Sequence, residues 1–243
     1  MDEATLQRIK GALSNAKRVV FLGGAGVSTA SGIPDFRSAN GLYSRKREDG
    51  RSYEDLLSID YFEEDPKGFY DFYWSTMVVP SAKPNPAHLA LTEYQKRHHL
   101  AILTQNIDGL HQMAGSSNVY EFHGSTYRYA CRKCGKKFTL DELDRHGVPI
   151  CPSCGGIIKP EVVLYGEALP SDALYGGIEE VRGADVMIVA GTSLRVYPFA
   201  SVPNYFRGRL SVLINAEPTP SDAMFDIVLH EDLVAAITEI LHE

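Results

Sequence analysis

Short, continuously apolar runs alternate along the chain with segments in which apolar residues recur every three or four positions. The apolar runs lie at residues 18–22, 100–103, 186–190, 210–214 and 227–229. The periodic segments lie at residues 5–15, 87–98, 171–182 and 231–241. Such runs are typical of parallel strands buried on both faces, and such periodicity predicts amphipathic helices. The alternation therefore predicts an α/β fold with a doubly wound, Rossmann-like parallel sheet.

Two stretches interrupt this alternation. Residues 39–80 hold charged loops and an aromatic-rich segment with helical spacing, Phe69–Met77, and residues 124–162 hold every cysteine of the chain. We interpret both stretches as insertions that pack together as a small domain, made of a helical module and a zinc-binding module. A ligand cleft is then expected between this domain and a larger one. The large Rossmann-like domain would consist of residues 1–38, 81–123 and 163–243.

The cysteines form two CxxC pairs, Cys131–Cys134 and Cys151–Cys154, with 16 residues between them. This spacing fits a tetrahedral four-thiolate zinc site, and glycines directly after each pair allow the tight turns that such a site needs. Four protein thiolates leave no open coordination position, so we expect a structural zinc. The alternatives are a disulfide framework, which is typical of short secreted chains, and a redox CxxC, which usually starts a helix.

Composition limits the partners that we expect. Of the 243 residues, 44% are hydrophobic and 23% are charged, as in ordinary globular proteins, and the formal net charge is -7. A negative chain gains little from contact with nucleic acid or with an anionic membrane. The acidic N-terminus does not resemble a signal peptide, and no apolar run approaches the roughly 20 residues that span a bilayer. We therefore expect a cytoplasmic protein, and a monomer because no long coiled-coil pattern is present.

A glycine-rich turn follows the first predicted strand. Gly24, Ala25 and Gly26 let the backbone approach a pyrophosphate, whose charge suits the amide groups at the start of a helix. The usual dinucleotide fingerprint is incomplete, because Thr29 stands at the position of its third glycine and no clear second strand with a terminal acid follows. Pro34 ends the helix early. On these residues alone, a simple tight turn is as good an interpretation as a phosphate loop.

Polar residues also follow later predicted strands. Gln105, Asn106 and Asp108 come just after the apolar run 100–103, and three polar side chains at a strand end favour a site over a plain turn. His123 ends a strand-like segment and precedes a glycine. Histidine is the usual general base near neutral pH, so His123 is a candidate for that role. Other histidines lack such a setting, namely His88, His98, His99 and His146.

The chain resembles the sirtuins, the NAD-dependent protein deacylases, in these segments and in their order. The segments are Gly24–Ser38, Gln105–Asp108 and His123–Gly124, followed directly by the cysteine module. The first matches the family's signature over its whole length, with Val27 as a mild aliphatic variant. The resemblance extends over most of the chain and implies NAD as co-substrate together with one structural zinc.

The resemblance also implies roles for individual residues. His123 would be the general base on a ribose hydroxyl, while Asn106 and Asp108 would orient the attacked sugar and the amide. Ala25 and Thr29 would line the phosphate and ribose region of NAD, under a mobile loop that carries an aromatic residue and an arginine. The full set of NAD-binding residues that it implies is Gly24, Ala25, Gly26, Thr29, Asp35, Phe36, Arg37, Gln105, Asn106, Ile107, Asp108, His123, Gly191, Thr192, Ser193, Asn215 and Asp232.

An acyl-lysine peptide would lie as an added strand between residues 159–167 and 191–198, held mainly by backbone hydrogen bonds. The implied substrate contacts are Val163, Tyr165, Gly166, Glu167, Leu194 and Val196, with Tyr165 in place of the more usual phenylalanine. Sirtuins that prefer acidic acyl groups carry a tyrosine followed three positions later by an arginine. Here Tyr70 is followed by Tyr73. We therefore expect acetyl or longer apolar acyl groups rather than succinyl or malonyl.

The function that this resemblance implies is NAD-dependent deacetylation of protein lysine. The acetyl group of acetyl-lysine would pass to ADP-ribose, releasing nicotinamide, free lysine and O-acetyl-ADP-ribose. Protein ADP-ribosyl transfer is an alternative, because it uses the same activated ribose with another acceptor. A non-catalytic NAD-sensing or zinc-ribbon interaction module is a second alternative, although a binder gains nothing from a base beside the ribose.

Overall fold

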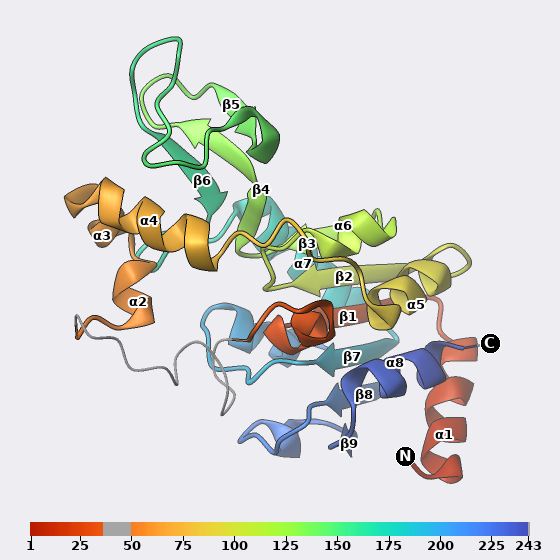
Figure 1. Cartoon of the computed structure of the whole chain (residues 1–243). Coiled ribbons are helices and arrows are strands. Elements are labelled where there is room, and N and C mark those ends of the chain that lie inside the picture. The colour runs from red at the N-terminus through yellow and green to blue at the C-terminus, as the bar shows by residue number, and fades with distance from the viewer. Residues whose placement is uncertain (36–49, 243) are drawn as a thin grey trace.

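A computed structural model describes residues 1–35 and 50–242. Its centre is a six-stranded parallel sheet with the strand order β3-β2-β1-β7-β8-β9 (Figure 1). The strands are β1 (Val19–Gly23), β2 (Leu100–Thr104), β3 (Val119–Glu121), β7 (Val186–Ala190), β8 (Leu210–Ile214) and β9 (Ile227–Leu229). This confirms the predicted doubly wound fold. The strand order reverses between β1 and β7, which is where open α/β sheets bind ligands at the carboxyl ends of their strands.

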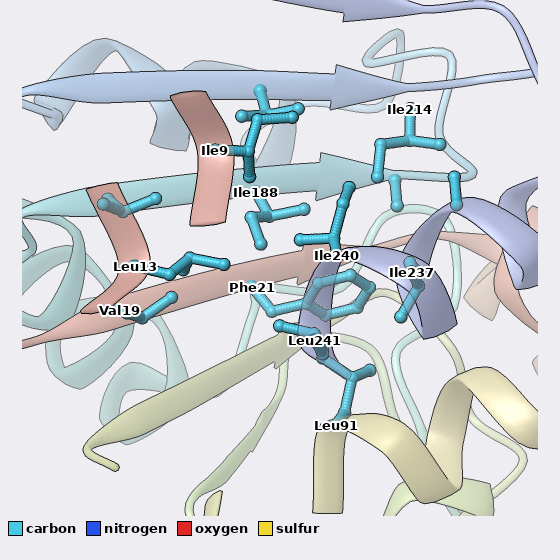
Figure 2. Close-up of a cluster of buried hydrophobic side chains, with 14 of the residues drawn as sticks. Ile9, Leu13, Val19, Phe21, Leu91, Ile188, Ile214, Ile237, Ile240 and Leu241 are labelled. Atoms are coloured by element: carbon cyan, nitrogen blue, oxygen red, sulfur yellow. The ribbon is translucent and has the colours of Figure 1, made fainter. Parts of the chain in front are cut away.

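The core lies on both faces of this sheet because successive strand residues point to opposite sides. Helices α1 (Glu3–Ser14), α5 (Pro86–Gln95) and α8 (Leu233–Leu241) cover one face, where Phe21 and Ile188 are buried (Figure 2). Helix α7 (Ser171–Gly183) and the 3-10 helix η4 (Phe199–Tyr205) cover the other. Each large apolar side chain buried here contributes about 1.5–3 kcal/mol to stability.

The two insertions share one aromatic cluster. The first forms α2 (Tyr53–Leu56), α3 (Ile59–Glu64) and α4 (Pro66–Thr76), and the second forms an antiparallel sheet. The cluster joins Phe62, Tyr70 and Tyr73 from the helices to Tyr129 and Ile158 from that sheet. We retain the division into a large and a small domain as our interpretation of this arrangement. The sheet has the order β5-β4-β6, with β4 (Gly124–Cys131), β5 (Lys137–Thr139) and β6 (Ile158–Val162).

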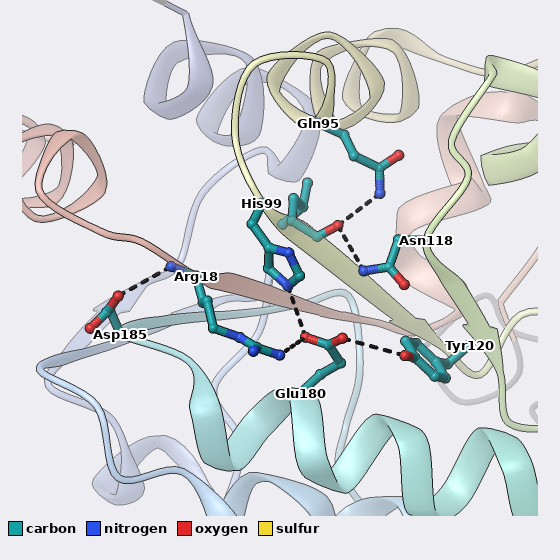
Figure 3. A network of polar contacts seen from close by, with 8 residues as sticks. Arg18, Gln95, His99, Asn118, Tyr120, Glu180 and Asp185 are labelled. Atoms are coloured by element: carbon teal, nitrogen blue, oxygen red, sulfur yellow. Dashed lines mark hydrogen bonds and ion pairs between the residues drawn. The ribbon is translucent and has the colours of Figure 1, made fainter.

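A polar network fastens the amino ends of β1 and β2 to α7 (Figure 3). Glu180 of α7 accepts from Arg18 at 2.8 Å and pairs with His99 Nε2 at 2.9 Å. Burial alone would raise the pKa of Glu180, but the hydrogen bonds from His99 and Arg18 outweigh it and hold that pKa below its ordinary value. These contacts lie at the opposite ends of the strands from the candidate site.

Element boundaries differ from the predictions where a local cap decides them. The segment after the glycine turn is a 3-10 helix, η1 (Ala25–Ser31), that ends at Gly32 with φ of 82°. Helix α8 begins at Leu233 rather than at residue 231, because Asp232 is its N-cap and accepts from the amide of Ala235. Among the described residues, no helix is both long and apolar enough to cross a membrane.

Candidate active site

A cavity of about 810 Å³ opens at the carboxyl ends of β1, β2, β7 and β8. Its walls come from the residues that directly follow those strands, together with His123 and the segments after α4, β6 and β9. The structure thus brings together segments that are far apart in sequence. The predicted residues that line it are Ala25, Gly26, Thr29, Asp35, Gln105, Asn106, Ile107, Asp108, His123, Val163, Tyr165, Gly166, Glu167, Gly191, Thr192, Ser193, Val196, Asn215 and Asp232.

The loops after β1 and β7 touch through their backbones. The Gly26 amide donates to the Gly191 carbonyl at 2.9 Å, and a Cβ on Gly26 would lie 2.7 Å from Gly191 Cα. Gly191 has φ of 62°, and a Cβ there would lie 2.6 Å from the Val27 nitrogen. Only glycine fits both positions, because real Cβ atoms do not approach other atoms so closely. This contact sets where η1 begins along the cavity wall.

Gly191→Ala is expected to lower the free energy of unfolding by about 2 kcal/mol or more, because alanine disfavours positive φ and its Cβ would displace η1. Urea denaturation measures this loss. The matched control is Gly11→Ala in α1, where an added Cβ meets nothing within 4 Å and should stabilise the helix by about 0.5–1 kcal/mol. Equal stability of Gly191→Ala and wild type would contradict this account.

Ser28 of η1 connects the polar residues that follow β2. Its Oγ donates to Asp108 Oδ2 at 2.6 Å and accepts from Asn106 Nδ2 at 3.0 Å. Burial raises the pKa of Asp108, and the hydrogen bonds from Ser28 and from the Leu110 amide oppose that rise. Ser28 lines the cavity, and sequence reasoning assigned it no role. The available signal was its place inside the segment Gly24–Ser38.

His123 is held in a defined orientation at the cavity wall. Its Nδ1 lies 3.0 Å from the carbonyl oxygen of Gln105. Because a carbonyl only accepts, the proton of the neutral ring is on Nδ1, and Nε2 carries the lone pair. Among the described residues, Nε2 has no hydrogen-bond partner. Burial lowers the pKa of His123, and the hydrogen bond to Gln105 offsets only part of that effect, so the ring is neutral at pH 7.

Thr192 and Asn215 form the wall after β7 and β8. The Thr192 amide donates to Asn215 Oδ1 at 3.1 Å, and Asn215 Nδ2 donates to the Thr192 carbonyl at 3.0 Å. Gln105 Nε2 donates to Thr192 Oγ1 at 2.7 Å. The side-chain amide of Asn215 is therefore already engaged in fixing the Thr192 backbone. Asp232 reaches the cavity as the N-cap of α8.

The segment after β6 is anchored by a buried ion pair. Lys159 Nζ lies 2.8 Å from Glu167, and Glu167 also accepts from the Leu164 amide. Lys159 is 7% exposed, and burial lowers its pKa despite the nearby carboxylate. This pair fixes the turn that carries Tyr165 into the cavity wall.

A few predicted site residues lie elsewhere. Leu194, with φ of 50°, packs into the core under η4 rather than lining the cavity. Gly24 lies behind the wall, where a Cβ would meet the Gly191 carbonyl at 2.6 Å. Phe36 and Arg37 fall outside the described residues.

The cysteine module has the geometry of a metal centre. The sulfur atoms of Cys131 and Cys154 are 3.4 Å apart, those of Cys134 and Cys151 are 3.8 Å apart, and all four lie within 4.8 Å of one another. Tetrahedral zinc with Zn–S bonds of about 2.3 Å requires sulfurs about 3.8 Å apart, whereas a disulfide requires about 2.05 Å. The four thiolates fit one zinc ion, and no side of that ion would be open to substrate.

Residues 24–198 match the Sir2 family. The chain belongs to the Sir2 family. It is 46% identical to an NAD-dependent protein deacetylase of Clostridium perfringens over 99% of this chain and 100% of that protein. It is 40% identical to one of Staphylococcus epidermidis over 100% and 99%. A solved structure of Sir2 with a p53 peptide and NAD+ has a TM-score of 0.85 at 36% identity, with 97% of each chain covered.

The structure of this Sir2-family chain also shows the setting of Tyr70 and Tyr73, whose effect on acyl preference stays a prediction. Tyr70 and Tyr73 are fully buried in the aromatic cluster, and the Tyr70 hydroxyl donates to the Ile158 carbonyl. Neither residue is among those that line the cavity. The part of this segment that does line the cavity is Thr76 and the residues after it, through Val79.

Proposed function

We propose that this Sir2-family chain is an NAD-dependent protein lysine deacetylase. It would transfer the acetyl group of acetyl-lysine to ADP-ribose and release nicotinamide, free lysine and O-acetyl-ADP-ribose. The observation that carries the proposal is the orientation of His123, whose Nδ1 is fixed on Gln105 while Nε2 remains available in the cavity. The names of the bacterial relatives support the same activity.

We assign NAD to the cavity from its donors. The turn that leads into η1 suits the phosphates, because Gly26 has no side chain and lets them approach the backbone closely. Gln105, Asn106 and Asp108 suit the nicotinamide ribose and carboxamide, because they offer amide donors and a carboxylate acceptor. Thr192, Ser193 and the loop after β8 would hold the adenosine half. NAD supplies the activated ribose to which the acyl group is transferred.

His123 would act as a general base in this reaction. Nε2 takes the proton of a ribose hydroxyl while the hydroxyl oxygen forms its bond to the acyl carbon. The neutral ring needs no prior deprotonation at pH 7, because burial holds its pKa below the ordinary value. The carbonyl of Gln105 keeps the proton on Nδ1 and stabilises the imidazolium that forms.

We place the acyl-lysine peptide between the segments that follow β6 and β7. Tyr165 and Tyr197 stand there with 38% and 75% of their surface exposed. A peptide added as an extended strand would bind mainly through its backbone, so sequence selectivity would be modest. We further propose that the protein works in the cytoplasm as a monomer, without nucleic acid or membrane partners, in keeping with its net charge of -7.

The direct test incubates the zinc-loaded protein with an acetyl-lysine peptide, with and without NAD, and follows peptide mass and nicotinamide. NAD-dependent loss of the acetyl group with equimolar nicotinamide release is the expected result. Nicotinamide release from a peptide that stays acetylated would indicate ADP-ribosyl transfer or NAD hydrolysis instead. NAD binding without any turnover would indicate a binding module.

Succinyl-lysine peptides are expected to react with a kcat/KM about 100-fold below that of acetyl-lysine peptides. Of the described residues that line the cavity, Arg195 is the single arginine or lysine, whereas Ile33, Met77, Val78 and Ile107 supply apolar surface. An unpaired carboxylate in such a site costs several kcal/mol. Steady-state kinetics with the two peptides measures the ratio. Comparable rates would contradict the expectation, and Arg195→Gln would then show whether the exposed guanidinium is responsible.

A further inference from the structure

Asn85 stands where the chain returns from the helical insertion to the large sheet. It is the N-cap of α5 and lies between two prolines, Pro84 and Pro86. Proline fixes its own φ and restricts the residue before it to extended backbone, so the conformation of Asn85 is set in advance. The side chain is 5% exposed, which is unusual for asparagine unless its polar groups are satisfied.

The two halves of the Asn85 side-chain amide have different partners. Oδ1 accepts from the Ala87 amide at 3.0 Å and thereby caps α5. Nδ2 donates to the Val27 carbonyl at 2.8 Å and to Ser31 Oγ at 3.0 Å. Both acceptors belong to η1, more than 50 residues earlier in the chain. The side-chain oxygen thus caps α5, and the side-chain nitrogen binds η1, which forms part of the cavity wall.

This contact completes a clamp on η1. On the cavity side, Ser28 holds the helix to Asn106 and Asp108. Asn85 holds the neighbouring Val27 carbonyl and Ser31 Oγ of the same helix. Ser28, Thr29 and Ala30, which line the cavity, lie between Val27 and Ser31 in the chain. The position of η1 therefore depends on a residue that itself does not line the cavity.

Two buried histidines support Asn85 from behind. The backbone N–H of Asn85 donates to His88 Nδ1 at 3.3 Å. The centroid of the His88 ring lies 4.7 Å from that of His111 in α6 (Leu110–Ala114). Burial lowers the pKa of His88 to about 4 and that of His111 to about 3, so both are neutral. His88 Nε2 and both His111 nitrogens have no partner among the described residues. Apolar side chains would fill this buried space without leaving polar nitrogens unpaired. The presence of two histidines there therefore favours a role in positioning Asn85.

We propose that Asn85 is a positioning residue for the NAD-binding wall, acting through the Val27 carbonyl and Ser31. The inference rests on the proposed function, because it assigns the η1 side of the cavity to NAD. It predicts that Asn85 affects the affinity for NAD far more than the affinity for peptide or the stability of the fold.

Asn85→Asp separates the two halves of the amide. Aspartate keeps the N-cap acceptor and the shape of asparagine, but at pH 8 its carboxylate cannot donate to the Val27 carbonyl. We expect the Kd and KM for NAD to rise about tenfold, with the peptide KM within about twofold of wild type. Ser31→Ala removes one acceptor without touching the cap of α5 and should raise the KM for NAD about threefold. If Asn85→Asp does not fold, the KM of Ser31→Ala for NAD still tests the proposal.

Asp2→Ala is the matched control, because it removes the N-cap of α1, which accepts from Thr5 at 2.8 Å and does not line the cavity. It should lower the melting temperature and leave the KM for NAD unchanged. Calorimetry of NAD binding and steady-state kinetics on all variants decide the matter. Wild-type NAD affinity in both Asn85→Asp and Ser31→Ala, or an equal rise in Asp2→Ala, would overturn the inference. Failure of the wild-type chain to bind or consume NAD would instead overturn the proposed function.

Discussion

His123→Ala is expected to lower kcat/KM for deacetylation by about 10²–10⁴-fold while the Kd for NAD changes little. General base catalysis accounts for a loss of that size, and removal of the ring leaves in place the hydrogen bonds that join Ser28 to Asn106 and Asp108. Calorimetry of NAD binding beside steady-state kinetics measures both quantities. His146→Ala is the matched control, because His146 is exposed and does not line the cavity.

The pH profile gives the same prediction an independent readout. Nε2 is active as a base only when the ring is neutral, and the pKa of His123 in the folded chain lies below 6.5 because of burial. Activity should therefore fall as the pH drops through this lowered pKa and level off at pH values above it. An acidic decline of kcat/KM with its midpoint above pH 6.5 would contradict this prediction. The same acidic decline in the residual activity of His123→Ala would also contradict it.

Continuous apolar runs explain why the sequence predicts the central strands well. The strands β7, β8 and β9 have the predicted bounds. Where a strand is buried on both faces, the ends of its apolar run coincide with the ends of the strand. The ends of helices depend on caps such as Asp232, which a periodic pattern does not register. The start of η1 is hydrogen-bonded to Gly191, a residue far along the chain, and such a contact is not visible in a local pattern.

The same reasoning separates the site residues that the sequence reveals from those that it hides. Polar residues at strand ends attract attention, so the segment after β2 and His123 could be proposed directly. Ser28 and Asn85 are buried polar residues whose partners lie 80 and 58 residues away, so local sequence does not reveal these contacts. The spacing of Tyr70 and Tyr73 is visible in the sequence, but their packing against Tyr129 and Ile158 of the small sheet is not.

Removing zinc is expected to abolish activity by unfolding the cysteine module rather than by removing a catalyst. Strand β4 carries Cys131 at one end and follows His123 at the other, and the Val163 amide donates to the His123 carbonyl at 2.9 Å. Loss of the metal would therefore release the strand that holds the base. Structural zinc contributes about 10–16 kcal/mol in small zinc domains, so Cys151→Ser should have the same effect as chelation.

Trp74 offers a way to distinguish unfolding from loss of a catalyst. Trp74 is the single tryptophan of the chain. Its Nε1 donates at 2.9 Å to the carbonyl of Gly147, which lies between the two CxxC pairs in sequence. Its ring stacks on that of Tyr70, with 5.2 Å between the ring centroids. During titration with a chelator, zinc release, the shift of Trp74 emission and the loss of deacetylation should follow one curve, and added zinc should reverse all three. Activity lost with unchanged Trp74 emission would indicate a catalytic metal, and full activity in folded, metal-free protein would show that the zinc is dispensable. The four thiolates leave no open position on the metal, and two of the cysteines are at most 3% exposed. We therefore expect zinc release, the emission shift and the loss of activity to follow one curve.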